Sequence, residues 1–79
     1  MEKIIFDYSK LKGRITEKCG SQKAFAELLG VSESTMTSKL NCDTYFTQPE
    51  IMKAVCILDI LLGKISAYFF TLRVEKSKL

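Results

Sequence analysis

One segment near the middle of the sequence constrains the fold most, because it has the pattern of two short helices separated by a glycine. Ser21 and Ser32 each precede a run of helix-forming residues, and a serine there can accept a hydrogen bond from the first turn as an N-cap. Gly30 lies between the two runs, where a residue with positive φ ends a helix without steric cost. We therefore expect helices over residues 22–29 and 33–40, joined by a sharp turn.

Three further helices are expected, one before this pair and two after it. Residues 9–19 place apolar side chains four positions apart, a helical spacing, and Gly20 ends the run. The stretch Thr47-Gln-Pro-Glu50 matches a capping box with proline in the first turn, which marks the start of a fourth helix. A short fifth helix is expected over residues 61–68. The predicted fold is a single all-α domain of five helices spanning all 79 residues.

The C-terminal part of the sequence is more apolar than a small core obviously needs. We expect residues 60–79 to form a dimerisation segment, although the same side chains could instead close the helical core. Apolar and polar residues alternate after residue 69, and a period of two favours a short strand or an extended arm. The side chains assigned to the interface are Leu61, Leu62, Ile65, Phe69, Phe70, Leu72 and Val74.

The composition argues against catalysis and against metal binding. The sequence has no histidine, which removes the commonest acid–base residue and metal ligand. Its three cysteines are far apart and form no Cys-x-x-Cys pair, so we expect free thiols rather than a zinc site or disulfides. We see no glycine-rich phosphate loop and no nucleophile paired with a base. We therefore expect no enzymatic activity, no metal and no cofactor.

The apolar stretch over residues 51–70 has about the length of a membrane span. It contains Lys53, Asp59 and Lys64, however, and each charge would cost roughly 2.5–3.5 kcal/mol near the centre of a bilayer. We interpret this stretch as core and interface, in a cytoplasmic protein.

The corner around Gly30 meets the physical requirements of a helix-turn-helix, in which the second helix enters the DNA major groove. Ala26 is small enough for the second helix to cross closely, and Met36 and Leu40 can anchor that helix while its start stays exposed. A local excess of positive charge precedes the corner and suits neighbouring phosphates, or is simply a solvated helix face. Its members are Lys10, Lys12, Arg14, Lys18 and Lys23.

Residues 22–43 resemble the helix-turn-helix of the phage repressor and Cro family. The matching residues are Gln22, Ala26, Gly30, Val31, Ser32, Met36, Lys39, Leu40 and Asn41. The whole chain is similar to the small Cro-like regulators of phages and prophages in Gram-positive bacteria. This resemblance implies a lambda-repressor-like fold and a homodimer that represses transcription by occupying a palindromic operator in double-stranded DNA. It also implies that the protein is associated with the nucleoid of a bacterial host.

The resemblance also implies roles for individual residues. Ser32, Glu33, Ser34 and Ser38 would face base edges, with Thr35 as a neighbouring candidate and the choice between Thr37 and Ser38 left open. Gln22 and Asn41 would contact phosphates, and charge or reach adds Lys10, Arg14, Lys23, Lys39 and Tyr45 to that group. Ordinary alternatives exist: Glu33 could favour the positive end of the helix, Asn41 could be a C-cap, and each lysine could be a solubilising charge.

A second class of function stays open. Residues 33–40 contain no arginine or glutamine, so the strongest contacts to guanine and adenine are missing there. A helix rich in serine and threonine would equally suit a helical adaptor, or an antirepressor that binds another regulator.

Overall fold

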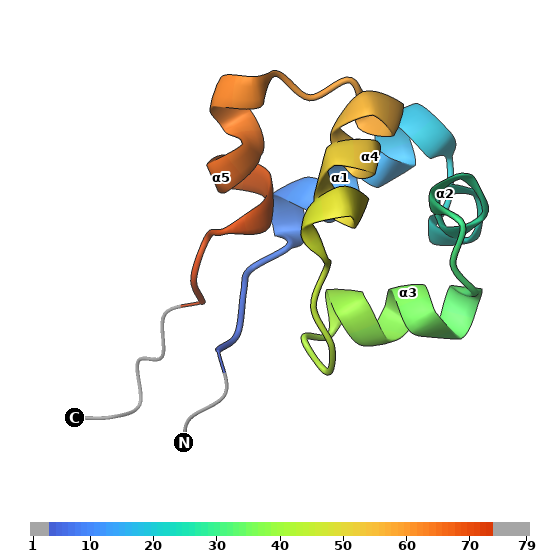
Figure 1. Ribbon diagram of the computed structural model, residues 1–79, viewed down its shortest axis with the longest axis horizontal. Helices are drawn as coiled ribbons and strands as arrows, with labels where there is room; N and C mark the ends of the chain where they lie inside the picture. The colour runs from blue at the N-terminus through green and yellow to red at the C-terminus, as the bar shows by residue number, and fades with distance from the viewer. Residues whose placement is uncertain (1–3, 74–79) are drawn as a thin grey trace.

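The computed structural model describes residues 4–73, and within that range the chain forms five α-helices (Figure 1). They are α1 (Ser9–Cys19), α2 (Gln22–Leu29), α3 (Glu33–Leu40), α4 (Gln48–Leu58) and α5 (Ile65–Phe69), with the 3-10 helix η1 (Leu62–Lys64) immediately before α5. The described residues contain no sheet. The prediction of an all-α fold is therefore confirmed.

The core lies where α1, α2, α4 and α5 meet, and α3 packs onto it through α2. Burying a large apolar side chain contributes about 1.5–3 kcal/mol, so a few such residues dominate the stability of a domain this small. The largest fully buried side chains are Phe25, Phe69, Leu11, Ile15, Met36, Leu58 and Cys42.

The corner between α2 and α3 forms as the local sequence predicts. The Ser21 hydroxyl accepts a hydrogen bond from the Ala24 amide at 3.1 Å, and the Ser32 hydroxyl accepts one from the Thr35 amide at 3.1 Å. Gly30 adopts a φ of 91°, a conformation in which a Cβ atom is disfavoured. The two serine caps and the glycine thus set the relative orientation of the two helices.

Helix α4 begins with the predicted capping box. The Glu50 amide donates to the Thr47 hydroxyl at 3.3 Å, and the Thr47 amide donates to the Glu50 carboxylate at 2.9 Å. The apolar stretch that follows is divided among α4, η1 and α5, with Asp59 in the left-handed region at a φ of 56°. Within residues 4–73, no helix combines the length and the apolar character that crossing a membrane requires.

The two ends of the described chain run side by side and form a terminal ribbon of residues 4–7 and 71–73 (Figure 1). Phe6 and Leu72 make an isolated antiparallel bridge, the Asp7 amide donates to the Thr71 carbonyl at 2.7 Å, and the Arg73 amide donates to the Ile5 carbonyl at 2.9 Å. The predicted C-terminal strand or arm is thus a single bridge, because its partner is an equally short segment.

The ribbon also covers a cysteine. The Phe6 amide donates to the Cys42 sulfur at 3.3 Å, and the Cys42 side chain is buried. The Tyr45 hydroxyl donates to the Ile4 carbonyl at 2.6 Å and holds the N-terminal segment to the loop between α3 and α4.

Candidate functional site

The start of helix α3 lies at one end of the molecule, far from α5 (Figure 1). Met36 and Leu40 are buried and anchor it, as predicted. Its first turns present small hydroxyl side chains to solvent, and we call this surface the hydroxyl face. Its members are Ser32, Ser34, Thr35 and Thr37, all exposed.

The hydroxyls of this face bond mainly to one another and to the helix backbone. The Ser32 hydroxyl donates to the Thr35 hydroxyl at 2.9 Å and lies 3.3 Å from the Ser34 hydroxyl. The Thr37 hydroxyl donates to the Glu33 carbonyl at 3.1 Å. The face is therefore compact and preorganised, and Glu33 is the exposed charge on α3.

Lys39 is the charged residue at the other end of α3, and it is buried. Its ammonium lies 2.9 Å from the Glu50 carboxylate, donates to the Tyr45 carbonyl at 3.0 Å and sits 5.8 Å from the centre of the Phe46 ring. Only 9% of its side chain is exposed. The expectation that Lys39 holds a phosphate needs correction, because this lysine ties the end of α3 to the start of α4.

The same contact perturbs the carboxyl of Glu50. Burial acts to raise the pKa of Glu50, but the hydrogen bond from the Thr47 amide and the ammonium of Lys39 together outweigh it and lower the pKa. Glu50 is therefore ionised at neutral pH, and the pair is a true ion pair.

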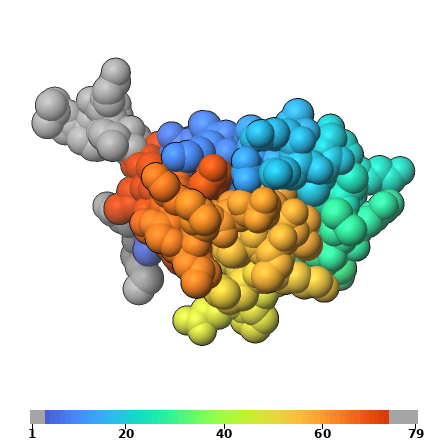
Figure 2. Space-filling model, turned by 90° about the horizontal axis from the view of Figure 1, so that it is seen from above, coloured from blue at the N-terminus to red at the C-terminus, as the bar shows by residue number. Residues whose placement is uncertain are grey.

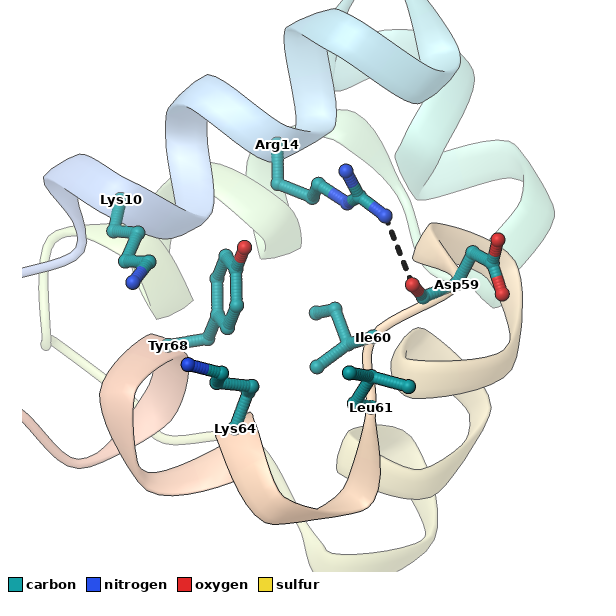
Figure 3. Close-up of a pocket in the computed structure, with 7 residues that line it drawn as sticks. All are labelled: Lys10, Arg14, Asp59, Ile60, Leu61, Lys64 and Tyr68. Carbon is teal, nitrogen blue, oxygen red and sulfur yellow. Dashed lines mark hydrogen bonds between the residues drawn. The ribbon is translucent and has the colours of Figure 1, made fainter.

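Two of the expected phosphate ligands, Lys10 and Arg14, lie on the face of α1 that packs against the end of α4 and α5 (Figure 3). The Arg14 guanidinium donates to the carbonyls of Leu58 and Asp59, each at 2.8 Å, and pairs with Glu17 at 3.2 Å. Arg14 thus caps the C-terminus of α4. It does not join α3 in one surface.

The remaining predicted contacts are scattered around the corner. Gln22 and Lys23 are exposed at the start of α2. Asn41 is exposed at the C-cap of α3, the alternative considered for it, and the Tyr45 hydroxyl is engaged by Ile4.

Between the two residues whose orientation was open, Thr37 is exposed and Ser38 is half-buried. The Ser38 carbonyl accepts the Asp43 amide at 2.9 Å and so helps to form the loop after α3.

The side chains assigned to a dimer interface do not share one environment. Phe69 is 1% exposed and belongs to the core, which corrects its assignment to an interface. Ile65 is half-buried, and Val74 lies outside the described residues. The strongly exposed members are Leu61, Leu62, Phe70 and Leu72.

Sequence reasoning missed Lys64 and Tyr68, which line a cavity together with Lys10 and Arg14 (Figure 3). Each pair is four residues apart, a spacing that places both members on one helix face. The sequence carries no signal that these two faces meet, since the contact depends on how the short segment before α5 folds back onto α1.

The thiols and the possible metal ligands are the side chains that bear on chemical reactivity. The three cysteines are free thiols that differ in exposure: Cys19 is half-buried, Cys42 is buried and Cys56 is exposed. Within residues 4–73, no group of three or more His, Cys, Asp or Glu side chains is placed to hold a metal ion.

The fold is similar to that of a solved protein, the modulator of repression (MOR) of the temperate bacteriophage TP901-1 from Lactococcus lactis. The two chains share 46% sequence identity and superpose with a TM-score of 0.72, over 89% of this chain and 95% of that one. No curated protein sequence matches this chain.

This finding corrects the expectation of a Cro-like repressor that acts as a homodimer on an operator. The similar structure is that of a modulator of repression, and the family model that matches residues 4–72 is described as "Protein of unknown function (DUF739)", with no match to a Cro or repressor family. The resemblance to the Cro family rests on the helical corner between α2 and α3, which by itself does not identify a repressor. The chain belongs to the DUF739 family.

Proposed function

We propose that this chain modulates repression by binding a DNA-binding repressor protein, and that it lowers the repressor's affinity for its operator. The observation that carries the proposal is the 46% identity to a modulator of repression over 89% of the chain. Identity at that level, with both chains almost fully covered, favours a shared biochemical role.

The charges on α3 also favour a protein partner over DNA. Binding to a duplex depends on cations that neutralise phosphates. The lysine of α3, Lys39, is already neutralised by Glu50 and withdrawn from solvent. An α3 that presents hydroxyls and the carboxylate of Glu33 would instead suit a basic protein surface, and the DNA-binding surface of a repressor is basic for the same electrostatic reason.

The hydroxyl face is the contact surface we propose. Its small side chains allow a partner to approach the helix closely, and each hydroxyl can donate or accept a hydrogen bond. Because the face is already held by its own hydrogen bonds, little side-chain entropy is lost when a partner docks.

The test uses the purified chain and the repressor encoded in the same genome, with a labelled operator fragment in a gel-shift assay. We expect the repressor alone to retard the operator and the chain alone to leave it unretarded. Adding the chain to the repressor should release the DNA, and gel filtration should show a complex of the two proteins. Retardation by the chain alone, or the absence of a protein complex, would refute the proposal.

Two matched variants test the surface. Glu33→Lys reverses the charge beside the hydroxyl face, and Glu17→Lys makes the same change on α1. Loss of one favourable charge contact and gain of a repulsive one should weaken repressor binding by roughly tenfold, about 1.4 kcal/mol, for Glu33→Lys only. Circular dichroism of both variants checks the fold, since Glu33 also favours the start of its helix. Equal affinities would place the contact elsewhere on the molecule.

A further inference from the structure

A second surface lies at the other end of the molecule from the hydroxyl face, where α1 meets η1 and α5 (Figures 1 and 2). Lys10 and Arg14 of α1 and Lys64 and Tyr68 from the α5 side enclose a cavity of about 270 Å³, which we call the cationic pocket (Figure 3). Three positive side chains from two separate parts of the chain therefore share one concave surface.

The acidic residue that lines this pocket, Asp59, does not compensate the positive charge of the two lysines, Lys10 and Lys64. The Asp59 side chain is turned away from the cavity and is 86% exposed, and its carboxylate lies 3.9 Å from the Lys18 ammonium (Figure 3). Among the described residues, no carboxylate is paired with Lys10 or Lys64. Like charges at close range repel one another, so an anion in the pocket would relieve that repulsion.

Two of the three positive groups, Arg14 and Lys10, are also held in place. Two backbone carbonyls at the end of α4 fix the Arg14 guanidinium at 2.8 Å each. The Lys10 ammonium lies 5.1 Å from the centre of the Tyr68 ring, a cation–π contact that keeps it at the edge of the cavity. A preorganised charge binds an anion at a smaller entropic cost than a freely moving one.

An apolar edge adjoins these charges. Ile60 is buried behind the cavity, whereas Leu61, which also lines it, is 73% exposed, and the neighbouring Leu62 is 68% exposed. An exposed apolar pair beside a charged cavity favours a ligand that carries an apolar group next to its negative charge.

We infer that the cationic pocket binds an acidic segment of a partner protein, with an Asp or Glu carboxylate between Lys10 and Lys64 and an adjacent apolar side chain on Leu61. At about 270 Å³ the cavity has room for a few side chains and covers only a local part of the surface, which favours a short peptide segment over an extended anionic surface. This site is separate from the hydroxyl face, and the inference does not depend on the proposed function.

The experiment uses the ¹⁵N-labelled full chain and NMR titration with the peptide Ac-Leu-Asp-Leu-Glu-Leu-NH2. The matched peptide Ac-Leu-Asn-Leu-Gln-Leu-NH2 removes both charges and keeps the shape. We expect the acidic peptide to shift resonances around Lys10, Lys64 and Tyr68, to bind more weakly as salt is added, and to leave α3 unperturbed. Weaker binding in salt follows from screening of the exposed charges.

The variant Lys10→Gln/Lys64→Gln removes both lysine cations of the cavity, and Lys12→Gln removes an exposed cation on α1 that does not line the cavity. Losing two partly exposed charge pairs should raise the dissociation constant of the acidic peptide about fivefold in the double variant and less than about twofold in Lys12→Gln.

Several results would overturn the inference. They are the same shifts with the uncharged peptide, unchanged affinity in the double variant, tighter binding of inorganic phosphate at the same resonances, and binding of phosphatidylserine vesicles without any binding of the peptide. The absence of any shift at millimolar peptide would refute it as well. None of these results bears on the gel-shift assay, so the two proposals can fail separately.

Discussion

The buried pair of Lys39 and Glu50 gives the sharpest test of how α3 is held. The change Glu50→Gln keeps the capping box, because glutamine can also accept the Thr47 amide, and removes only the negative charge. It leaves the Lys39 ammonium with the Tyr45 carbonyl and the Phe46 ring as its remaining partners. The variant therefore measures what it costs to keep this ammonium buried without its counter-charge.

The magnitude follows from the exposure of the two side chains. Removing one partner of a fully buried ion pair destabilises a protein by roughly 3–5 kcal/mol. Because 22% of the Glu50 side chain remains exposed, solvent already screens part of the interaction, and we expect about 2–3 kcal/mol here. In a domain of this size such a loss lowers the melting temperature by roughly 10–20 °C.

The assay is urea unfolding followed by circular dichroism, with the free energy of unfolding extrapolated to water. The control is Glu17→Gln, which removes the same charge from the pair that Glu17 forms with Arg14 near the surface, where 63% of the Glu17 side chain is exposed. We expect that change to cost less than about 1 kcal/mol. If Glu50→Gln cost no more than Glu17→Gln, the burial of Lys39 would not be what anchors the end of α3.

Three further predictions follow from single residues. The folded-state pKa of Glu50 is lowered from its ordinary 4.5, so the stabilisation by its charge is present above pH 4.5. This stabilisation is lost as the pH falls through the lowered pKa. In that pH range the free energy of unfolding should drop more steeply in the wild type than in Glu50→Gln. Gly30→Ala forces a Cβ into a φ of 91° and should lower the free energy of unfolding in urea by about 1–2 kcal/mol. Gly13→Ala, inside α1 with open space around it, should raise that free energy by about 1 kcal/mol. Equal effects of the two variants would contradict the role of the turn. Burial raises the pKa of Tyr8 to about 12, so the free energy of unfolding should fall as the pH rises above 10.0. An ultraviolet titration of the wild type compared with Tyr8→Phe should show that Tyr8 ionises near pH 12. Ionisation of Tyr8 near pH 10 in the folded protein would contradict its burial.

The parts of the fold that the sequence predicts are those governed by local chemistry. Ser21, Gly30, Ser32 and the capping box at Thr47 act within one turn of their own helix, so their pattern predicts the helix boundaries correctly. The C-terminal segment was predicted less well, because an isolated bridge to residue 6 decides its conformation, and that partner is distant in sequence.

The role of Lys39 is harder to predict because it depends on a long-range contact. As a sequence feature, a lysine near the end of α3 suggests a phosphate ligand. In the folded chain the loop after α3 brings the Tyr45 carbonyl and Glu50 to the Lys39 ammonium, and the charge is removed from the surface. A helical corner that suits DNA by its backbone geometry is therefore left without cations on its exposed helix, and no local pattern indicates that difference.

The cysteine beneath the terminal ribbon also makes this chain its own probe of local opening. A thiol-modifying reagent reaches the exposed Cys56 directly, but it reaches Cys42 only after the segment around Phe6 has lifted away. When reclosing is faster than modification, the ratio of the two labelling rates gives the equilibrium constant for that opening. The terminal ribbon can thus be followed separately from unfolding of the helical core, with no introduced label and no substitution.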